Sequence, residues 1–291
     1  MIGSAILLSN FIEGNMKQFI IPVYQRNYDW LIDNCEQLFN DLVKLSKQHK
    51  QTHFFGSIVT ASADAYGRNR LVIDGQQRIT TISLLLLAGI KAVKDGKLLV
   101  SNEARLNEAY EMFLLAKFSS ADRKIKLVPI ESDRIAYDLI FDNAEDKFIA
   151  ESKVTRNFMY FYGLLTKTPQ EFSFDDLLNT IERLQIITIE LDNNDDAQLI
   201  FESLNSTGLA LTEADKIRNY LLMSLSPEEQ QQCFKDYWQY KYNLPAFPCL
   251  FISLTERTGF SQGLKAFHSG TECHSVLESL HPLSEGIRKE V

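Results

Sequence analysis

The sequence predicts an α+β fold in which a small mixed α/β core precedes a largely helical remainder. Short β-branched and aromatic runs with turn residues between them occur early in the chain, at 53–60 and 70–73. Beyond about residue 100 the apolar residues recur instead at helical spacing. We therefore expect three regions: a core at 1–98, a helical region with a returning strand at 99–225, and a C-terminal tail at 226–291.

The elements of the predicted core follow in a simple order. Residues 18–30 have the pattern of a short extended segment and a turn, after which Asp33 or Asn34 caps a helix with an apolar side. Two strands, at 53–60 and 70–73, then form a hairpin because a polar loop joins them. The second strand leads directly into a polar turn and a long apolar helix.

The helical region is amphipathic, and we assign its aromatic residues, such as Phe158, to the core rather than to a ligand platform. Leu184–Leu191 is rich in isoleucine and is the expected returning strand. The block at 201–222 predicts two helices joined by a turn, and Thr212 with Asp215 forms a capping box for the second helix.

The polar turn after the hairpin carries the most chemistry, and it consists of Asp74, Gly75, Gln76, Gln77 and Arg78. Gly75 allows a tight turn, and the first amides of the following helix, together with Arg78, favour an anion such as phosphate. Asp74 is suited to hold a divalent cation or a water, and the two glutamines offer amide donors and acceptors. An ordinary alternative is that Asp74 caps the helix and the glutamines are solvated.

A second polar block, IPVYQRNYDW at residues 21–30, precedes the first helix. Pro22 fixes the backbone before Tyr24, and aromatic residues of this kind can stack on a base. Arg26 can reach either a phosphate or a carboxylate, so a structural salt bridge is an equal alternative to a ligand contact. The residues alone do not decide between these two roles.

Composition narrows the class of protein. The chain has 291 residues, is 45% hydrophobic and carries a formal net charge of −8, which argues against a protein that coats nucleic acid through bulk electrostatics. No apolar stretch reaches membrane-spanning length, and the cysteines lack paired spacing. We therefore expect a cytoplasmic protein with reduced thiols and no membrane contact.

Positive charge is in local excess between Tyr66 and Lys97. We favour a solvated helix face and end for its three lysines over a phosphate surface. The chain contains no GxxxxGK[ST] sequence, so any nucleotide hydrolysis would not use a P-loop. The basic residues of this segment are Arg68, Arg70, Arg78, Lys91, Lys94 and Lys97.

Four blocks together resemble the N-terminal domain family of GmrSD-type restriction endonucleases, which has a ParB/sulfiredoxin-like core. Their order and spacing match that family from about residue 10 to about residue 225. The blocks are IPVYQRNYDW at 21–30, HFFGSIV at 53–59, DGQQR at 74–78 and FESLNSTGLALTEADKIRNYLL at 201–222.

The resemblance implies a nucleotide-binding module that hydrolyses NTP, with GTP favoured, and that regulates a modification-dependent restriction or anti-phage system. It implies Mg²⁺ as cofactor, with Asp74 as a ligand. The implied catalytic residues are Asp74, Gln76, Gln77 and Arg78. The implied nucleotide-binding residues are Tyr24, Gln25, Arg26, Gly75, Asn205, Asp215, Lys216 and Asn219.

A different class of function stays open. A ParB-like core also serves DNA-binding proteins and nucleases, so the DGQQR turn could grip DNA phosphate without hydrolysing a nucleotide. Many relatives continue into an HNH-type nuclease domain, whereas this sequence stops at Val291 without a recognisable nuclease block. Two explanations stay open: the tail at 226–291 is truncated or diverged, or a separately encoded HNH-type nuclease partner supplies the cutting. In either case we do not expect this chain alone to cleave DNA.

Overall fold

The structure is a computed structural model. The chain divides into two compact units, Met1–Ser226 and Pro227–Val291, and the helices and strands named here belong to the first. The division at residues 98 and 225 stays a prediction. The structure describes residues 1–48, 52–64, 66–119, 121–167 and 171–192, together with Asp195, Ile200, Leu222, Glu229, Gln230 and Gln232.

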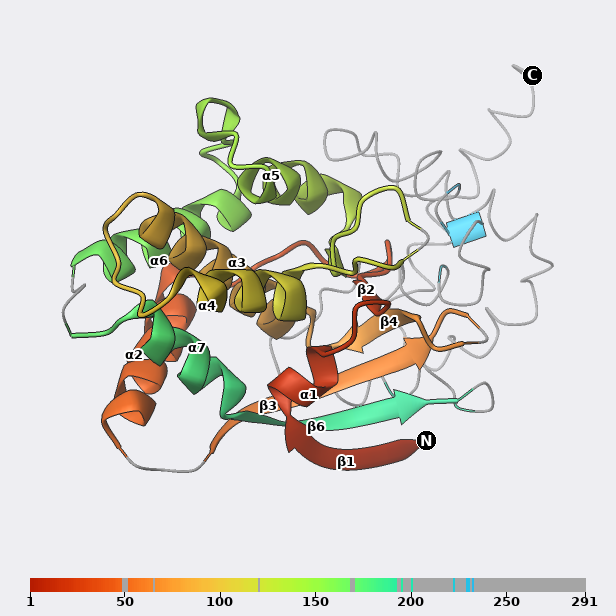
Figure 1. Ribbon diagram of the computed structural model, residues 1–291. Helices are drawn as coiled ribbons and strands as arrows, with labels where there is room; N and C mark the ends of the chain where they lie inside the picture. The colour runs from red at the N-terminus through yellow and green to blue at the C-terminus, as the bar shows by residue number, and fades with distance from the viewer. Residues whose placement is uncertain are drawn as a thin grey trace, which may run out of the picture. The chain divides into compact units, whose positions relative to one another are not determined.

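A mixed sheet forms the base of the first unit (Figure 1), and over the described residues it has six strands. β3 (His53–Ser62) and β4 (Asn69–Asp74) form the antiparallel hairpin that the sequence predicts, and β6 (Leu184–Leu191) returns parallel to β3. β2 (Gln18–Ile20) lies parallel to both β4 and β5 (Leu127–Val128). Across the sheet the order is β1 (Ile2–Leu7), β6, β3, β4, β2 and β5.

Helices gather on one side of this sheet (Figure 1), and α3 (Gln76–Lys94) is one of them. α3 is buried along almost its whole length, as a helix that is apolar on nearly every side must be. The predicted α+β class is therefore confirmed. The helices are α1 (Leu8–Ile12), α2 (Ile32–Lys47), α3 (Gln76–Lys94), α4 (Glu103–Ala109), α5 (Glu131–Phe141), α6 (Lys153–Lys167) and α7 (Phe174–Glu182).

Both faces of the central strands are covered. Ile58 and Val72 belong to the main core beneath the helices, whereas their neighbours Val59 and Ile73 join a smaller cluster with Leu191. Successive side chains of a strand point to opposite faces, so these two clusters lie on opposite sides of the sheet. The β3–β4 pair is therefore held from both sides just before the DGQQR turn.

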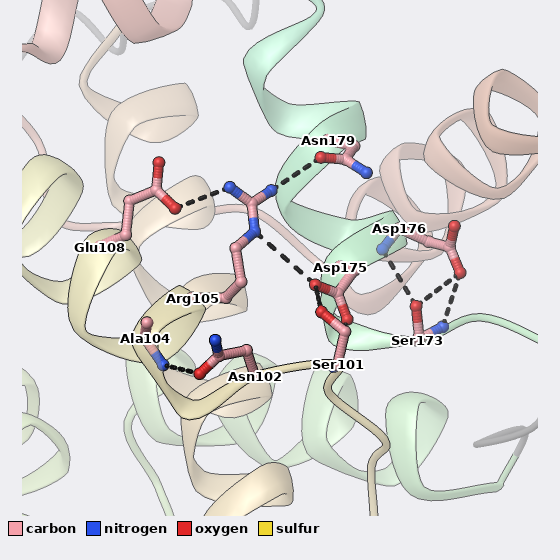
Figure 2. Close-up of polar contacts among 9 residues, drawn as sticks. All are labelled: Ser101, Asn102, Ala104, Arg105, Glu108, Ser173, Asp175, Asp176 and Asn179. Carbon is pink, nitrogen blue, oxygen red and sulfur yellow. Dashed lines mark hydrogen bonds and ion pairs between the residues drawn. The ribbon is translucent and has the colours of Figure 1, made fainter.

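The joint between α4 and α7 fixes the outer helices (Figure 2). Arg105 of α4 donates to Asn179 Oδ1 at 2.7 Å, and its Nε lies 3.6 Å from Asp175 Oδ1. Asp175 also accepts from the backbone and hydroxyl of Ser101, each at 2.8 Å. These contacts tie the segment after α3 to α7, and we give them a structural role.

Most sequence-predicted boundaries agree with the structure. The strand at Leu184–Leu191 is confirmed, but the predicted cap of α2 is wrong: Leu31 precedes the helix, and its N–H donates to Asn34 Oδ1 at 3.0 Å. Asn34 stands in the first turn and reaches back, which satisfies a backbone amide at the helix start. In the part of the chain that the structure describes, no helix has the length and apolar character needed to span a bilayer.

Candidate functional site

The DGQQR turn lies against β3, and two glycines make this contact possible. Gly75 has φ of +90°, in the left-handed region, and precedes the first residue of α3. A Cβ atom on Gly75 would lie 2.9 Å from Ile58 Cγ1 and 3.0 Å from the carbonyl oxygen of Ser57. Both the backbone angle and the close approach of β3 therefore require glycine at this position.

Gly56 permits a similar close approach, between the backbone of β3 and the side chain of Arg78. The pairing of β3 with β6 shifts register between Phe54 and Gly56, and Gly56 has φ of +120°. A Cβ atom there would lie 2.5 Å from Arg78 Nε. The guanidinium thus rests on bare backbone, where Nη1 donates to Ser57 O at 3.1 Å and lies 3.9 Å from Asp74 Oδ2. The sequence-based site did not include Gly56, although the HFFGSIV block contains it.

Gln25 and Gln76 form a buried pair of amides beneath the turn. The Gln25 side chain donates from Nε2 to the carbonyl oxygen of Ile73 at 2.7 Å and accepts from Gln76 Nε2 at 3.1 Å. Both side chains are buried. The backbone of β4 therefore fixes Gln25, and Gln25 orients the amide of Gln76.

Gln77 is used differently from its neighbour. Its Oε1 accepts from the backbone N–H groups of Asp29 at 2.8 Å and Trp30 at 3.2 Å, and its Nε2 donates to Asn27 O at 3.1 Å. The buried amide thus spans three residues of the IPVYQRNYDW segment. Gln77 positions that segment over the start of α3.

The alternative of a capping Asp74 and solvated glutamines is wrong. Gly75 occupies the position before α3, no side chain caps this helix, and Gln76 and Gln77 are buried. Asp74 itself is partly exposed at the end of β4, beside Arg78. Its carboxylate is therefore available to a ligand rather than tied to the helix start.

Tyr24 and Arg26 flank Gln25 on the same segment. Tyr24 is buried, and burial raises the pKa of its hydroxyl, so this side chain stays neutral. Arg26 is partly exposed, and its guanidinium makes no ion pair within the described part of the chain. The structural salt bridge considered for Arg26 is therefore not found among these residues.

Three residues from the helical region also contact the segment at 21–30, and no pattern in the sequence predicted their role. Asn157 of α6 donates to Tyr28 Oη at 3.0 Å and to Trp30 O at 2.9 Å, and Tyr28 Oη also contacts Thr81 of α3 at 2.7 Å. Asp133 of α5 accepts from the Tyr28 backbone N–H at 2.6 Å, and burial raises the pKa of its carboxyl to about 6. The third residue, Lys153 of α6, pairs with Asp29.

A pocket opens beside Arg78, between α2 and the start of β3. Its volume is about 230 Å³. Aromatic rings and hydrogen-bonding side chains share its wall, so it suits a planar polar ligand. The lining residues are Trp30, Asn34, Gln37, Leu38, Asp41, His53, Phe54, Phe55 and Arg78.

The third block of candidate residues cannot be placed. Asn205, Asp215, Lys216 and Asn219 lie outside the described residues. Among the residues that the structure describes, no three His, Cys, Asp or Glu side chains gather to hold a metal ion. Asp74 alone still fits Mg²⁺, which commonly binds one or two carboxylates together with phosphate oxygens and waters.

The fold and site define a class of protein: an α+β domain whose polar site joins residues 21–30 to a glycine-dependent turn at the start of a buried helix. The family model for the GmrSD restriction endonuclease N-terminal domain matches residues 7–222, and the chain belongs to this family. The resemblance drawn from the sequence is thereby confirmed. No curated protein matches this chain. The chain is accordingly a component of a restriction system.

Proposed function

We propose that this domain binds and hydrolyses a nucleoside triphosphate, with GTP favoured, and that hydrolysis regulates the restriction system. The arrangement of Arg78 carries the proposal. Its guanidinium rests on the backbone at Gly56 and stands beside Asp74, and its Nη2 has no partner within the described residues. A cation held in place at the start of a helix suits a phosphate group.

We assign the following roles to the residues of the candidate site. Arg78, Arg26 and the first amides of α3 neutralise the phosphates, which is the main way that proteins accelerate phosphoryl transfer. Gln76 positions the attacking water, because Gln25 fixes one end of its amide. Gln77 is occupied by the backbone of residues 27–30, so we assign it to holding that segment.

Asp74 would hold Mg²⁺ together with oxygens of the bound nucleotide. The ion would supply further neutralisation of the triphosphate charge when bound. The fit depends on a carboxylate that is partly exposed and that does not cap α3.

The first experiment measures magnesium-dependent phosphate release from GTP, ATP, CTP and UTP, with and without DNA. Arg78→Ala is expected to lower release about 10²–10³-fold, the typical cost of removing one group that stabilises transition-state charge. Gly56→Ala keeps the arginine but places a Cβ atom 2.5 Å from its Nε, so release should also fall. Arg134→Ala, at an exposed arginine of α5, is the matched control.

Full phosphate release by a folded Arg78→Ala protein would show that the proposed site is wrong. No release from folded wild type, with or without DNA, would overturn hydrolysis by this chain alone. A separately encoded HNH-type nuclease is part of the proposal as the regulated partner, and its addition is the next condition to test.

The second candidate function is DNA sensing without nucleotide hydrolysis, and the loop of the β3–β4 hairpin favours it. Tyr66 is 81% exposed, and the Arg68 guanidinium lies 5.0 Å from its ring centroid. Asp64 stiffens the loop because it accepts from three backbone N–H groups, those of Tyr66, Arg68 and Asn69. An exposed aromatic–arginine pair suits stacking and phosphate contact.

DNA binding that weakens steeply as salt rises, and that Tyr66→Ala with Arg68→Ala removes, would support this second candidate. Binding that is unchanged in the double variant would exclude the hairpin as the contact.

A further inference from the structure

We propose that the pocket between α2 and the start of β3 binds the nucleobase, and that Asp41 within it selects guanine. This inference rests on the proposed nucleotide function, because Arg78 at the edge of the pocket would hold the phosphates. Nothing in the family match assigns a role to this pocket.

The size and walls of the pocket suit a base rather than a whole nucleotide. Its volume of about 230 Å³ is below the range of roughly 300–1,000 Å³ that is typical of pockets for larger ligands. Trp30, Phe54 and Phe55 contribute aromatic surface to it. Phe54 is 58% exposed, so its ring is open for stacking.

The position of the pocket relative to the DGQQR turn is the second argument. Arg78 belongs both to the turn and to the pocket wall, so a ligand in the pocket lies next to the guanidinium. Gln77 clamps the backbone at Asp29 and Trp30, and Asn34 Oδ1 holds the Leu31 N–H at 3.0 Å. The turn thereby fixes the segment that leads into α2, which carries the polar wall of the pocket.

The hydrogen-bonding groups on that wall favour guanine. Asp41 is partly buried, and its Oδ2 lies 3.9 Å from His53 Nε2 while its Oδ1 lies 3.9 Å from Lys44 Nζ. Both distances exceed hydrogen-bonding range, so the carboxylate oxygens keep their capacity to accept. Guanine presents adjacent N–H donors at N1 and N2, which a carboxylate accepts together, whereas adenine presents a donor next to an acceptor.

Nucleotide selectivity tests this assignment. We would measure kcat/KM for GTP, ATP and inosine triphosphate, which lacks the 2-amino group of guanine, in wild type and in Asp41→Asn. Asp41→Asn should lower kcat/KM for GTP about 10- to 100-fold, the typical worth of hydrogen bonds to a charged group, mainly through KM. The loss for ATP should be smaller, and the preference for GTP over inosine triphosphate should shrink. Asp33→Asn, at an exposed residue of the same helix, is the matched control.

A binding measurement separates failure of the pocket from failure of hydrolysis. The chain has two tryptophans, so Trp238→Phe leaves Trp30 as the remaining fluorophore, and Trp30 lines the pocket. GTP should quench its emission, and Phe54→Ala should weaken that binding. Quenching without phosphate release would support the pocket and overturn hydrolysis. Unchanged selectivity in Asp41→Asn and unchanged binding in Phe54→Ala, with release still lost in Arg78→Ala, would overturn the pocket alone. A wild type that prefers ATP would overturn the guanine assignment.

Discussion

Both ends of α3 carry polar and charged residues, but the two ends differ in how these side chains are held. At the N-terminal end the side chains of Gln76, Gln77 and Arg78 contact backbone groups or amides of β3 and of residues 25–30. At the C-terminal end Lys94 and Lys97 are exposed to solvent. The candidate site lies at the first of these two ends, where hydrogen bonds tie the polar side chains to other segments of the chain.

Side-chain partners take up the positive charge at the C-terminal end. Lys91 Nζ lies 3.0 Å from Asp95 Oδ2 and also pairs with Glu145. Lys97 donates to Tyr162 Oη at 2.9 Å, and Tyr162 in turn donates to Asp95 at 2.6 Å. The predicted solvated face holds for two of the three lysines, but Lys91 is 8% exposed. The local excess of basic residues is therefore not one phosphate-binding surface.

The two ends of α3 show that the contacts that hold a polar side chain are more important for ligand binding than its charge. Arg78 donates to a backbone carbonyl on a strand that is covered on both faces, whereas Lys97 relies on another exposed side chain. A group held by buried backbone has little freedom to lose when a ligand binds, so its interaction with that ligand is stronger.

The largest expected effect on stability is at the N-terminal end, where the two glutamines can be compared directly. Gln77→Ala leaves the backbone groups of Asn27, Asp29 and Trp30 without their partner, and the free energy of unfolding should fall by about 2–4 kcal/mol. Gln76→Ala removes one amide contact and should cost about 1 kcal/mol. Chemical denaturation of both variants measures the difference. Equal losses would contradict the separate roles assigned to them.

A smaller effect is expected at Asp133, which supports Tyr28. Burial raises the pKa of this carboxyl to about 6, above its ordinary value. The folded state therefore holds the proton more tightly than the unfolded state does. As a result, the free energy of unfolding falls as the pH rises from about 4 to about 6. Asp133→Asn keeps an acceptor for the Tyr28 N–H and removes the buried charge. It should raise the free energy of unfolding by about 1–2 kcal/mol at pH 7.5 and leave it nearly unchanged at pH 4.

Denaturation curves at the two pH values check this prediction, with wild type measured in parallel. A gain that is the same at both values would show that removal of the charge is not its cause.

The smallest effect is expected at the C-terminal end of α3. Lys97→Ala removes an exposed hydrogen bond to Tyr162, and the melting temperature and any phosphate release should stay within error of wild type. Thermal unfolding and the phosphate-release assay measure both. A clear loss of release would mean that the two ends of α3 act together, which would break the comparison.

Local sequence pattern was enough for much of the fold. The β3–β4 hairpin, the start of α3 at Gln76 and the strand at Leu184–Leu191 all agree with expectation, because apolar periodicity and turn glycines report on neighbouring residues. The sequence pattern did not predict β1. Its strand, Ile2–Leu7, is defined by pairing with β6, which lies at the other end of the described chain.

The sequence by itself determined the elements around the turn, the need for glycine at position 75 and the family, since each depends on residues that are close together in the chain or on the order of short blocks. Only the tertiary structure decided how the polar residues are used. Gly56 supports Arg78, Gln77 clamps residues 27–30, and Asn157 with Asp133 fixes Tyr28. These contacts join segments that are far apart in the sequence. Because the tertiary fold sets which buried donor pairs with which acceptor, the local sequence pattern does not predict these pairs.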